Sequence, residues 1–542
     1  MDILAKLNPA QREAVEQVSG PVLILAGPGS GKTRVITHRV AYLIKACGVS
    51  PRHIMSVTFT NKAAKEMGER LNRLLGSQAK ELTLGTFHAI CARILRRDGR
   101  TIGISPGFTI YDAEDQLKLI KRATQGVNLD PKQYAPPLIR SRISAAKSQM
   151  LTPKDYTSQG TSYLDEVVGR VYERYQHLLT ESSALDFDDL LMKVVKLFRG
   201  QPEVLAKYQE RYRHIMVDEL QDTNLTQYEL VKQLSGKYRN ICVVGDPDQS
   251  IYSWRFADMR NILNFEKDYP DTKVVLLEQN YRSTKRILET ASSIISANGQ
   301  RQPRKLWTEN APGELTTAVE TYNEQEEAQF VVSEVSRLVE QGKARLCDCA
   351  VMYRTNAQSR ALEEAFIRYG TPYKLVAGTR FYERREVKDI IAYLRLIQNP
   401  SDSVSLLRVI NIPQRAIGKR SISKLSDWAE SREVSLYEAL RLIAASADNE
   451  SESPELPFSR RTAMLLAGFF SFMEEIIAKS VELNMADLFG LVVKSSGYRQ
   501  YILKEADGEE RWDNILELGS VASEYSGLKP REGLAAFLEG VA

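Results

Sequence analysis

Short apolar runs rich in β-branched residues alternate with stretches of helical periodicity over the first half of the chain. The runs are residues 21–26, 54–58, 82–85, 214–218, 241–244 and 273–277. Each run ends in polar or glycine-containing residues, which is how parallel strands meet the functional edge of an α/β sheet. The pattern therefore predicts a parallel sheet flanked by helices.

The alternation stops at residues 111–199, where segments such as QLKLIKRATQ and EVVGRVYERYQHLL have the helical period. We interpret this region as a helical insertion. A second α/β stretch is expected from about Lys273 and includes DCAVMYRTN, and from about Phe381 the pattern is again helical. A polar surface loop is predicted at residues 446–454. The predicted domains are a first α/β domain (1–110 and 200–275), its helical insertion (111–199), the start of a second α/β domain (276–380) and a second helical insertion (381–542).

Composition narrows the class of protein. The apolar share of 43% and the charged share of 26% are those of an ordinary soluble protein. A net charge of +4 means that any nucleic-acid footprint consists of local patches. The five cysteines are scattered, and neither a signal peptide nor a membrane span is apparent, so we expect a soluble intracellular protein with reduced thiols.

A phosphate-binding loop is predicted at residues 26–33, AGPGSGKT, between the strand PVLIL and the helical pattern TRVITHRVAYLI. Glycines let backbone amides turn around phosphate oxygens, and the helix N-terminus adds its positive dipole end. Lys32 would reach the β- and γ-phosphates, and the Thr33 hydroxyl would hold Mg²⁺. The usual pattern begins with Gly, whereas this chain has Ala26, a small residue that should be tolerated.

Adjacent carboxylates follow the strand of residues 214–217 in HIMVDELQD. Asp218 suits a magnesium shell, and Glu219 suits polarisation of an attacking water. A lone Asp-Glu pair after a strand is more often a solvated turn. Gln221 and Asp222 directly behind it, with the phosphate loop upstream, favour the catalytic interpretation.

The order of motifs from residue 7 to about 418 resembles that of superfamily I DNA helicases of the UvrD/Rep/PcrA group. The matching segments are LNPAQ (7–11), TFTNKAA (58–64), GTFH (85–88), VDELQDTN (217–224), GDPDQSIYSWRFAD (245–258), QNYRS (279–283) and YRTNAQS (353–359). The resemblance implies an α/β fold of RecA-like P-loop motor domains, each a parallel sheet flanked by helices, with two mainly helical inserted subdomains. It also implies ATP-dependent 3′–5′ movement on single-stranded DNA coupled to duplex unwinding, in DNA repair or replication in the bacterial cytoplasm.

By the same resemblance, Gln11 would hydrogen-bond adenine, Tyr281 would stack on it, Gln249 would sense the γ-phosphate and Arg282 would act as an arginine finger. Lys32, Glu219, Gln249 and Arg282 form the predicted catalytic set. The predicted nucleotide-binding residues are Gln11, Ala26, Gly27, Gly29, Ser30, Gly31, Lys32, Thr33, Arg34, Tyr281 and Arg282, with ATP and Mg²⁺ as cofactors and Thr33, Asp218 and Glu219 around the metal.

Proteins that bind single strands without sequence preference stack bases on aromatic faces, each worth ~1–3 kcal/mol, and steer the backbone with cations. The predicted DNA-binding residues are Phe59, Asn61, Thr86, Phe87, His88, Tyr252, Trp254, Arg255, Arg354 and Asn356. Two interpretations of Phe59 and Phe87 stay open: base-stacking faces, or core residues at strand ends. The expected partners are single-stranded DNA, junctions of single- and double-stranded DNA, and repair or replication proteins, with no membrane.

Departures from the family pattern qualify these expectations. Leu220 replaces the usual aromatic, with little expected effect. Phe256 stands where the family usually has Gly, and positive φ there would strain a Phe by roughly 1–3 kcal/mol. Ala416 likewise replaces a common Gly in IPQRAIGK, which resembles a duplex-contacting turn. The chain stops at Ala542, before the family's Thr-x-His and second arginine motifs, so we expect a fragment or natural truncation that unwinds DNA poorly alone.

Other functions stay open at this stage. A truncated, ATP- and DNA-binding regulatory protein without unwinding activity is the main alternative to a helicase. A helicase–nuclease subunit would need a nuclease domain, which this sequence does not supply. RNA as the substrate is disfavoured by the motif set and is not excluded by the residues themselves.

Overall fold

The computed structural model describes residues 3–298, 305–376, 381–448, 456–505 and 507–541. The predicted polar loop at 446–454 therefore lies mostly outside the described residues. Two compact units are present, one made of residues 1–312 with 389–542 and the other of residues 313–388. These units do not separate the first α/β region from either helical region, so the domain boundaries given above stay a prediction.

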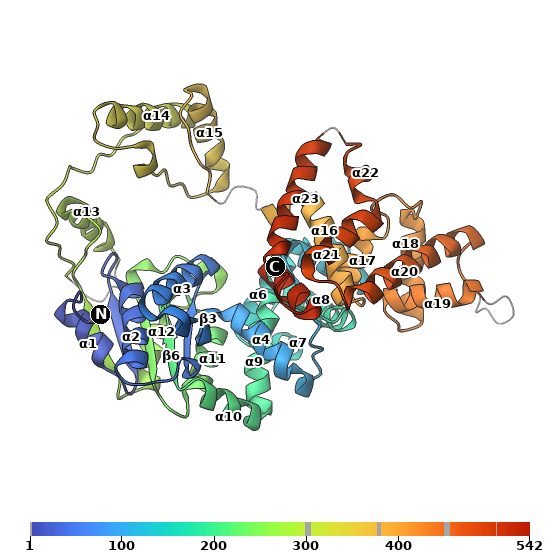
Figure 1. Cartoon of the computed structure of the whole chain (residues 1–542), viewed down its shortest axis with the longest axis horizontal. Coiled ribbons are helices and arrows are strands. Elements are labelled where there is room, and N and C mark those ends of the chain that lie inside the picture. The colour runs from blue at the N-terminus through green and yellow to red at the C-terminus, as the bar shows by residue number, and fades with distance from the viewer. Residues whose placement is uncertain (1–2, 299–304, 377–380, 449–455, 506, 542) are drawn as a thin grey trace. The chain divides into compact units, whose positions relative to one another are not determined.

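The first unit contains a six-stranded sheet that lies among the helices of the N-terminal region (Figure 1). All neighbouring strands are parallel, in the order β3-β2-β6-β7-β1-β8. The strands are β1 (Val22–Ala26), β2 (Ile54–Thr58), β3 (Thr83–Thr86), β6 (His214–Val217), β7 (Ile241–Gly245) and β8 (Lys273–Leu277). Every predicted apolar run is thus a strand. The last was expected to open a second α/β stretch, but it pairs with β1 as an edge strand of this sheet.

Alternate residues of the central strands face two separate cores. Leu23 and Leu25 of β1 belong to one cluster, whereas Val22 and Ile24 belong to the other. Because both faces are buried, the strands have continuous apolar runs rather than a polar–apolar alternation. The helices of this α/β region are α1 (Pro9–Glu16), α2 (Lys32–Lys45), α3 (Asn61–Leu75), α4 (Phe87–Asp98), α10 (Pro202–Arg211), α11 (Leu225–Ser235), α12 (Arg260–Asp268) and α13 (Lys285–Ile295).

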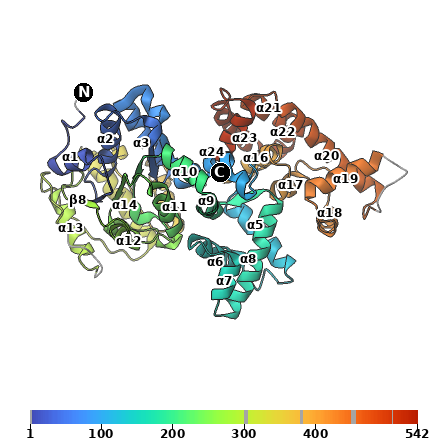
Figure 2. The same cartoon turned by 90° about the horizontal axis from the view of Figure 1, so that it is seen from below.

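The predicted helical insertion contains α5 (Ala113–Gly126), α6 (Pro136–Ser148), α7 (Pro153–Gln159), α8 (Tyr163–Glu181) and α9 (Phe187–Gly200). Figure 2 shows α5 to α8 side by side, around a core that includes Ile120, Val171 and Tyr175. A short parallel pair joins the segment before α5 to the segment after α8: β4 (Thr109–Tyr111) pairs with β5 (Ala184–Asp186). Three residues are too few for a periodicity to reveal, so the pair was not predicted.

The second unit contains α14 (Glu324–Glu340) and α15 (Ser359–Arg368), packed through a small core of Ala328, Val332 and Ala365. The segment DCAVMYRTN was expected to belong to an α/β stretch, but its described residues form no strand. Met352 is 94% exposed. A strand needs backbone partners on a neighbouring strand, and no described segment of this unit pairs with these residues.

The chain after residue 381 is helical, as predicted. Its helices are α16 (Arg385–Gln398), α17 (Ser403–Val409), α18 (Lys419–Ser431), α19 (Leu436–Asp448), α20 (Arg460–Ser480), α21 (Met485–Ser496), α22 (Tyr498–Ile502), α23 (Gly508–Ser523) and α24 (Pro530–Gly540). Buried polar contacts join this region to the first insertion within the first unit: Arg395 pairs with Asp115 at 2.6 Å, and the Tyr111 hydroxyl donates to Asp402 at 2.7 Å.

Candidate functional site

The loop from Ala26 to Lys32 leaves the carboxyl end of β1 and enters α2. Gly29 (φ +66°) and Gly31 (φ +90°) hold the left-handed backbone that glycine adopts at little cost. A Cβ on Gly29 would stand 2.6 Å from Asn280 Nδ2, and therefore there is also no room for a side chain at this position. Gly31 caps α2 without a side-chain hydrogen bond, which leaves the first amides of the helix open to an anion.

Lys32 lies at the centre of a polar cluster on this sheet edge. Its ammonium donates to Glu219 Oε2 at 2.8 Å and to Gln249 Oε1 at 3.4 Å. Its side chain is only 10% exposed, so the cation is largely removed from water. The three side chains come from the ends of β1, β6 and β7, which are brought together because parallel strands end at one edge.

The two carboxylates at the end of β6 have different environments. Asp218 is buried and accepts from the Thr33 hydroxyl at 3.4 Å, and burial together with the charge of Glu219 raises its pKa to about 7. Glu219 lies in the left-handed region, at φ +55°, and its Oε2 also accepts from Gln221 Nε2 at 2.8 Å. A strained non-glycine backbone held by several contacts is typical of a functional position.

The donor set fits a magnesium ion that is shared with a phosphate. Mg²⁺ usually binds through one or two carboxylates, several waters and phosphate oxygens rather than in a complete protein cage. Asp218 and Thr33 provide adjacent oxygens beside the phosphate loop. Among the described residues no group of three or more His, Cys, Asp or Glu is arranged to hold a metal alone.

The raised pKa of Asp218 predicts a pH-dependent stability. Since the folded pKa of about 7 lies above the usual 3.8, the native chain keeps a proton that the unfolded chain releases as pH rises from about 4 to 7. This carboxyl therefore lowers the stability of the nucleotide-free protein progressively over that range. We expect Asp218→Asn to raise the thermal midpoint at pH 8 by several degrees and to change it little at pH 4.5, measured by calorimetry; equal shifts at both pH values would contradict the burial of this charge.

Gln221 connects this acidic pair to the next loop, residues 245–258. Its side-chain Oε1 accepts from the backbone N–H of Asp246 at 2.9 Å, and its backbone carbonyl accepts from the Ser250 hydroxyl at 3.3 Å. The Gln249 amide in turn donates to Asp246. The predicted site does not include Gln221. Its position directly after Glu219 and Leu220 is the one sequence signal that indicates it.

Residues predicted to bind the base gather on the other side of the loop. Gln11 is buried; its Nε2 donates to the carbonyl of Ser30 at 2.9 Å and its Oε1 accepts from the amide of Asn8. The Tyr281 amide donates to the carbonyl of Gly29 at 3.0 Å, and its hydroxyl accepts from Asn8 Nδ2 at 2.8 Å. The Arg34 guanidinium donates to the carbonyl of Lys6, and Ala26 is buried in β1 beside Leu277.

An aromatic row begins three residues after Gln249. The Phe59 and Tyr252 ring centroids are 4.7 Å apart, those of Tyr252 and Trp254 are 6.1 Å apart, and the Arg255 guanidinium lies 4.6 Å from the Trp254 ring centroid. Trp254 is 59% exposed. Neighbouring aromatic rings with a cation beside them are the features that bind unpaired bases and their backbone.

Phe256 has φ +63°, so the position does need the left-handed conformation that the family's usual Gly would supply. At such a position Gly is normally better than any residue with a Cβ, by about 1 kcal/mol. We expect Phe256→Gly to have a thermal midpoint roughly 2 °C above that of Phe256→Ala, the reverse of the ordinary order. Both variants lose the ring, so their difference measures the backbone strain alone, and an Ala variant as stable as Gly would contradict it.

The remaining predicted DNA residues lie in different environments. Phe87 is 2% exposed and packs in the core with Ile90, which favours the core interpretation, and its base-stacking role stays a prediction. Thr86 is buried and caps α4 through Ala89 N–H. His88 packs edge-on against Phe187, with ring centroids 5.6 Å apart, and burial lowers its pKa to about 4.

Asn61 is exposed at the first turn of α3, behind the capping Thr60. Phe187, at the start of α9, was missed by the sequence analysis, because only its contact with His88 brings it to this surface. Arg354 and Asn356 lie in the second unit, both exposed, where Gln358 Oε1 accepts from the amide of Arg354 at 2.9 Å. Their DNA role stays a prediction.

Comparisons with known proteins agree with this arrangement. Residues 7–270 match the family described as UvrD/REP helicase N-terminal domain, and residues 275–542 match that described as UvrD-like helicase C-terminal domain. The chain is 44% identical over 542 residues to ATP-dependent DNA helicase PcrA of Bacillus subtilis (strain 168), which covers the whole chain and 72% of that relative. It is 44% identical over 532 residues to PcrA of Staphylococcus aureus (strain Mu50), covering 98% of the chain and 71% of the relative. None of the described helices is both long and apolar enough to cross a membrane.

Proposed function

The chain belongs to the UvrD/REP helicase family, and from that premise we propose that it is an ATP-dependent DNA helicase moving 3′–5′ on single-stranded DNA. ATP hydrolysis would drive stepping along the strand and unwinding of the duplex ahead, in DNA repair or replication in the bacterial cytoplasm. One observation carries the proposal: a single short loop joins Gln249, beside Lys32, to the aromatic row of Tyr252 and Trp254.

Each polar group of the cluster has a role in phosphoryl transfer. The loop amides and Lys32 would hold the β- and γ-phosphates, and Mg²⁺ at Thr33 and Asp218 would neutralise their charge. Glu219 would accept a proton from the attacking water. Lys32 pairs with Glu219 at 2.8 Å, and a γ-phosphate held by Lys32 would compete with Glu219 for the ammonium.

Coupling would pass through the loop of residues 245–258. Gln249 contacts Lys32 and Asp246, and Gln221 ties Asp246 to the acidic pair. A shift of Gln249 toward the γ-phosphate would therefore move the backbone that carries Tyr252 and Trp254. A few residues of backbone would thus connect the phosphate site to the proposed DNA site. This connection would explain why phosphate-sensing and base-stacking side chains share one loop.

The test is the ATPase rate of the full chain with and without single-stranded DNA, compared with Lys32→Ala and Trp254→Ala. We expect stimulation by DNA in the wild type and loss of turnover in Lys32→Ala. Trp254→Ala should weaken single-strand binding about tenfold, as expected for one lost stacking face, with nucleotide affinity within twofold. Equal losses of both affinities in Trp254→Ala would remove this residue from the DNA side.

Unwinding of a duplex with a 3′ single-stranded tail distinguishes a helicase from the alternative, a regulatory protein that binds ATP and DNA. DNA-stimulated ATPase without unwinding would favour the alternative. A duplex with a 5′ tail is the polarity control, because equal unwinding of both substrates would contradict 3′–5′ movement. A 3′-tailed RNA duplex tests the substrate class in the same assay.

A further inference from the structure

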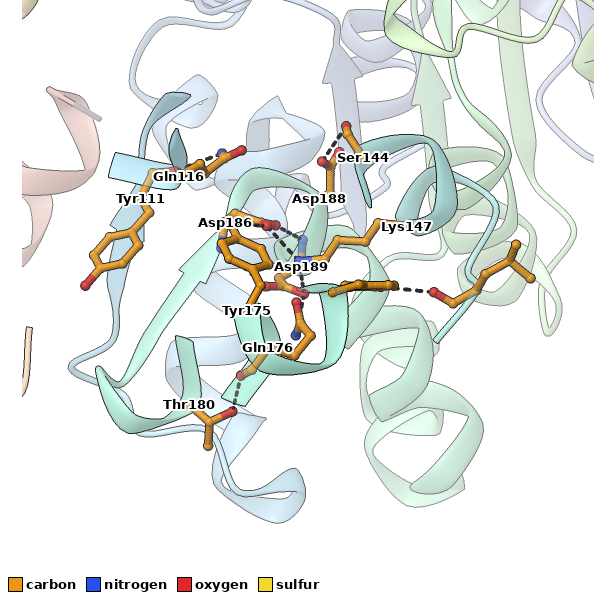
Figure 3. Close-up of polar contacts among 12 residues, drawn as sticks. Tyr111, Gln116, Ser144, Lys147, Tyr175, Gln176, Thr180, Asp186, Asp188 and Asp189 are labelled. Atoms are coloured by element: carbon orange, nitrogen blue, oxygen red, sulfur yellow. Dashed lines mark hydrogen bonds and ion pairs between the residues drawn. The ribbon is translucent and has the colours of Figure 1, made fainter. Parts of the chain in front are cut away.

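Lys147, near the end of α6, has a fully enclosed side chain among the helices of the first insertion (Figure 3). Its Nζ lies 2.7 Å from Asp186 Oδ2 and 2.9 Å from Asp189 Oδ1, and both carboxylates are buried. The ring of Tyr175 covers the ammonium at 5.1 Å, and the Tyr175 hydroxyl donates to Asp186 at 2.9 Å. A buried cation between two carboxylates is costly to desolvate, so it calls for an explanation beyond packing.

The two carboxylates define how α9 begins. Asp186 caps the helix by accepting from the amide of Asp189 at 2.8 Å, and Asp189 accepts from the amide of Asp186 in return. Lys147 binds the remaining oxygens of this reciprocal cap, so the ammonium fixes the first turn of α9 in place. Ser144, one turn earlier on α6, adds a second tie by donating to Asp188 at 2.7 Å.

The residue inside that cap is Phe187. Its ring packs edge-on against His88 at 5.6 Å, and His88 lies close enough to Arg255 for the guanidinium charge to contribute to its lowered pKa. The turn that Lys147 fixes therefore contacts His88, and His88 lies near Arg255 of the aromatic row.

The backbone of the same residue reaches the nucleotide side. The Thr226 hydroxyl donates to the carbonyls of Lys147 at 3.3 Å and Ser148 at 2.9 Å. Thr226 lies in the first turn of α11, which follows the acidic loop of residues 218–224 directly. Lys147 thus contacts α9 through its side chain and α11 through its main chain.

We propose that Lys147 is a positioning residue for single-stranded DNA binding, which acts by holding the first turn of α9 so that Phe187 stays against His88. The inference rests on the proposed function. The proposed role in DNA binding belongs to a side chain that is fully enclosed within the protein.

The test removes one charge of each sign, as Lys147→Met with Asp189→Asn, so that the net charge of the buried cluster is unchanged. Asp186 keeps the Tyr175 hydroxyl and the amide of residue 189 as donors. We expect the Kd for a fluorescently labelled oligothymidine to rise about tenfold, with the Kd for ATP and the DNA-free ATPase rate within twofold of wild type. The matched control is Arg395→Met with Asp115→Asn, which removes another buried ion pair of the same unit and should leave the oligothymidine Kd unchanged.

A double-mutant cycle then separates positioning from stability. If Lys147 acts through Phe187, adding Phe187→Ala to the paired variant should weaken oligothymidine binding no further than Phe187→Ala alone, within twofold. Additive losses would overturn the proposal, as would parallel losses of ATP and DNA affinity.

If the paired variant is unfolded at 25 °C, Lys147→Arg is the second variant. It keeps the charge but replaces a point donor by a planar fork, and it should raise the Kd for oligothymidine about threefold. Wild type that fails to bind oligothymidine would overturn the proposed function as well, whereas binding that is unchanged in the variants would overturn this inference alone.

Discussion

Glu219→Gln is expected to lower the DNA-stimulated ATPase rate about 10²–10⁴-fold, the usual contribution of a general base. The amide has the size of the carboxylate, so Gln221 keeps an acceptor at the same place, whereas the group can no longer take a proton. Nucleotide affinity should be retained or slightly higher, because Lys32 loses the anion that it binds without ATP. Single-turnover hydrolysis and ATP titration of the same preparation measure the two effects separately.

Glu203→Gln on α10 is the matched control, since it makes the same chemical change at an exposed position away from the cluster. That variant should hydrolyse ATP at the wild-type rate. The Glu219→Gln variant could instead bind ATP more than tenfold more weakly and keep the wild-type rate constant at saturating ATP. That result would show that Glu219 orders the phosphate loop and does not activate the attacking water. Separate measurements of the ATP affinity and of the hydrolysis rate constant therefore test whether Glu219 acts as the general base, and not only whether activity requires it.

The sheet and its phosphate loop were predictable because local chemistry determines them. A run of about five apolar, β-branched residues bounded by polar ones suits a strand buried on both faces, and all six such runs are strands. The loop at residues 26–33 was equally clear, since positive φ and close approach at Gly29 leave few other residue types possible there. The acidic pair followed from its place at a strand end.

Other features depend on contacts that no local pattern contains. Phe87 and Phe59 both follow strands, yet the first is in the core and the second packs on Tyr252, because their neighbours come from distant segments. DCAVMYRTN has the composition of a strand and lacks a partner strand among the described residues. Lys147 has the sequence context of an ordinary helix surface, and only the fold encloses it between two carboxylates.

The strained backbone at Glu219 and Phe256 shows a further limit of prediction from the sequence. Both residues have positive φ, at +55° and +63°, and both lie on the loops that join the nucleotide cluster to the aromatic row. For Phe256 a family comparison raised the question and the structure confirms the conformation. Nothing in the residue type of Glu219 indicates it, because a Glu is as unsuited to that backbone as most residues are. Strained non-glycine residues in both loops agree with a site whose geometry is held by its surroundings.

Arg282→Ala is expected to lower the ATPase rate about 10³-fold or more, the loss associated with an arginine finger. The residue lies beside the phosphate loop: its amide donates to Asn280 Oδ1 at 2.8 Å, and a Cβ on Gly29 would stand 2.8 Å from its own Cβ. Within the described residues its exposed guanidinium makes no ion pair or hydrogen bond, so it is available to a γ-phosphate.

Arg282→Lys separates charge from shape in this prediction. A lysine keeps the cation but replaces the planar fork by a point donor on a different stem, so we expect it to recover less than a tenth of the lost rate. Arg286→Ala is the control, because Arg286 lies one turn away on α13 and pairs with Glu289 at its exposed surface. Since a finger stabilises the charge that develops in phosphoryl transfer, kcat should fall while the Kd for ATP changes by less than about fivefold. A loss confined to the Kd, with kcat preserved, would instead make Arg282 a residue that binds the ground state.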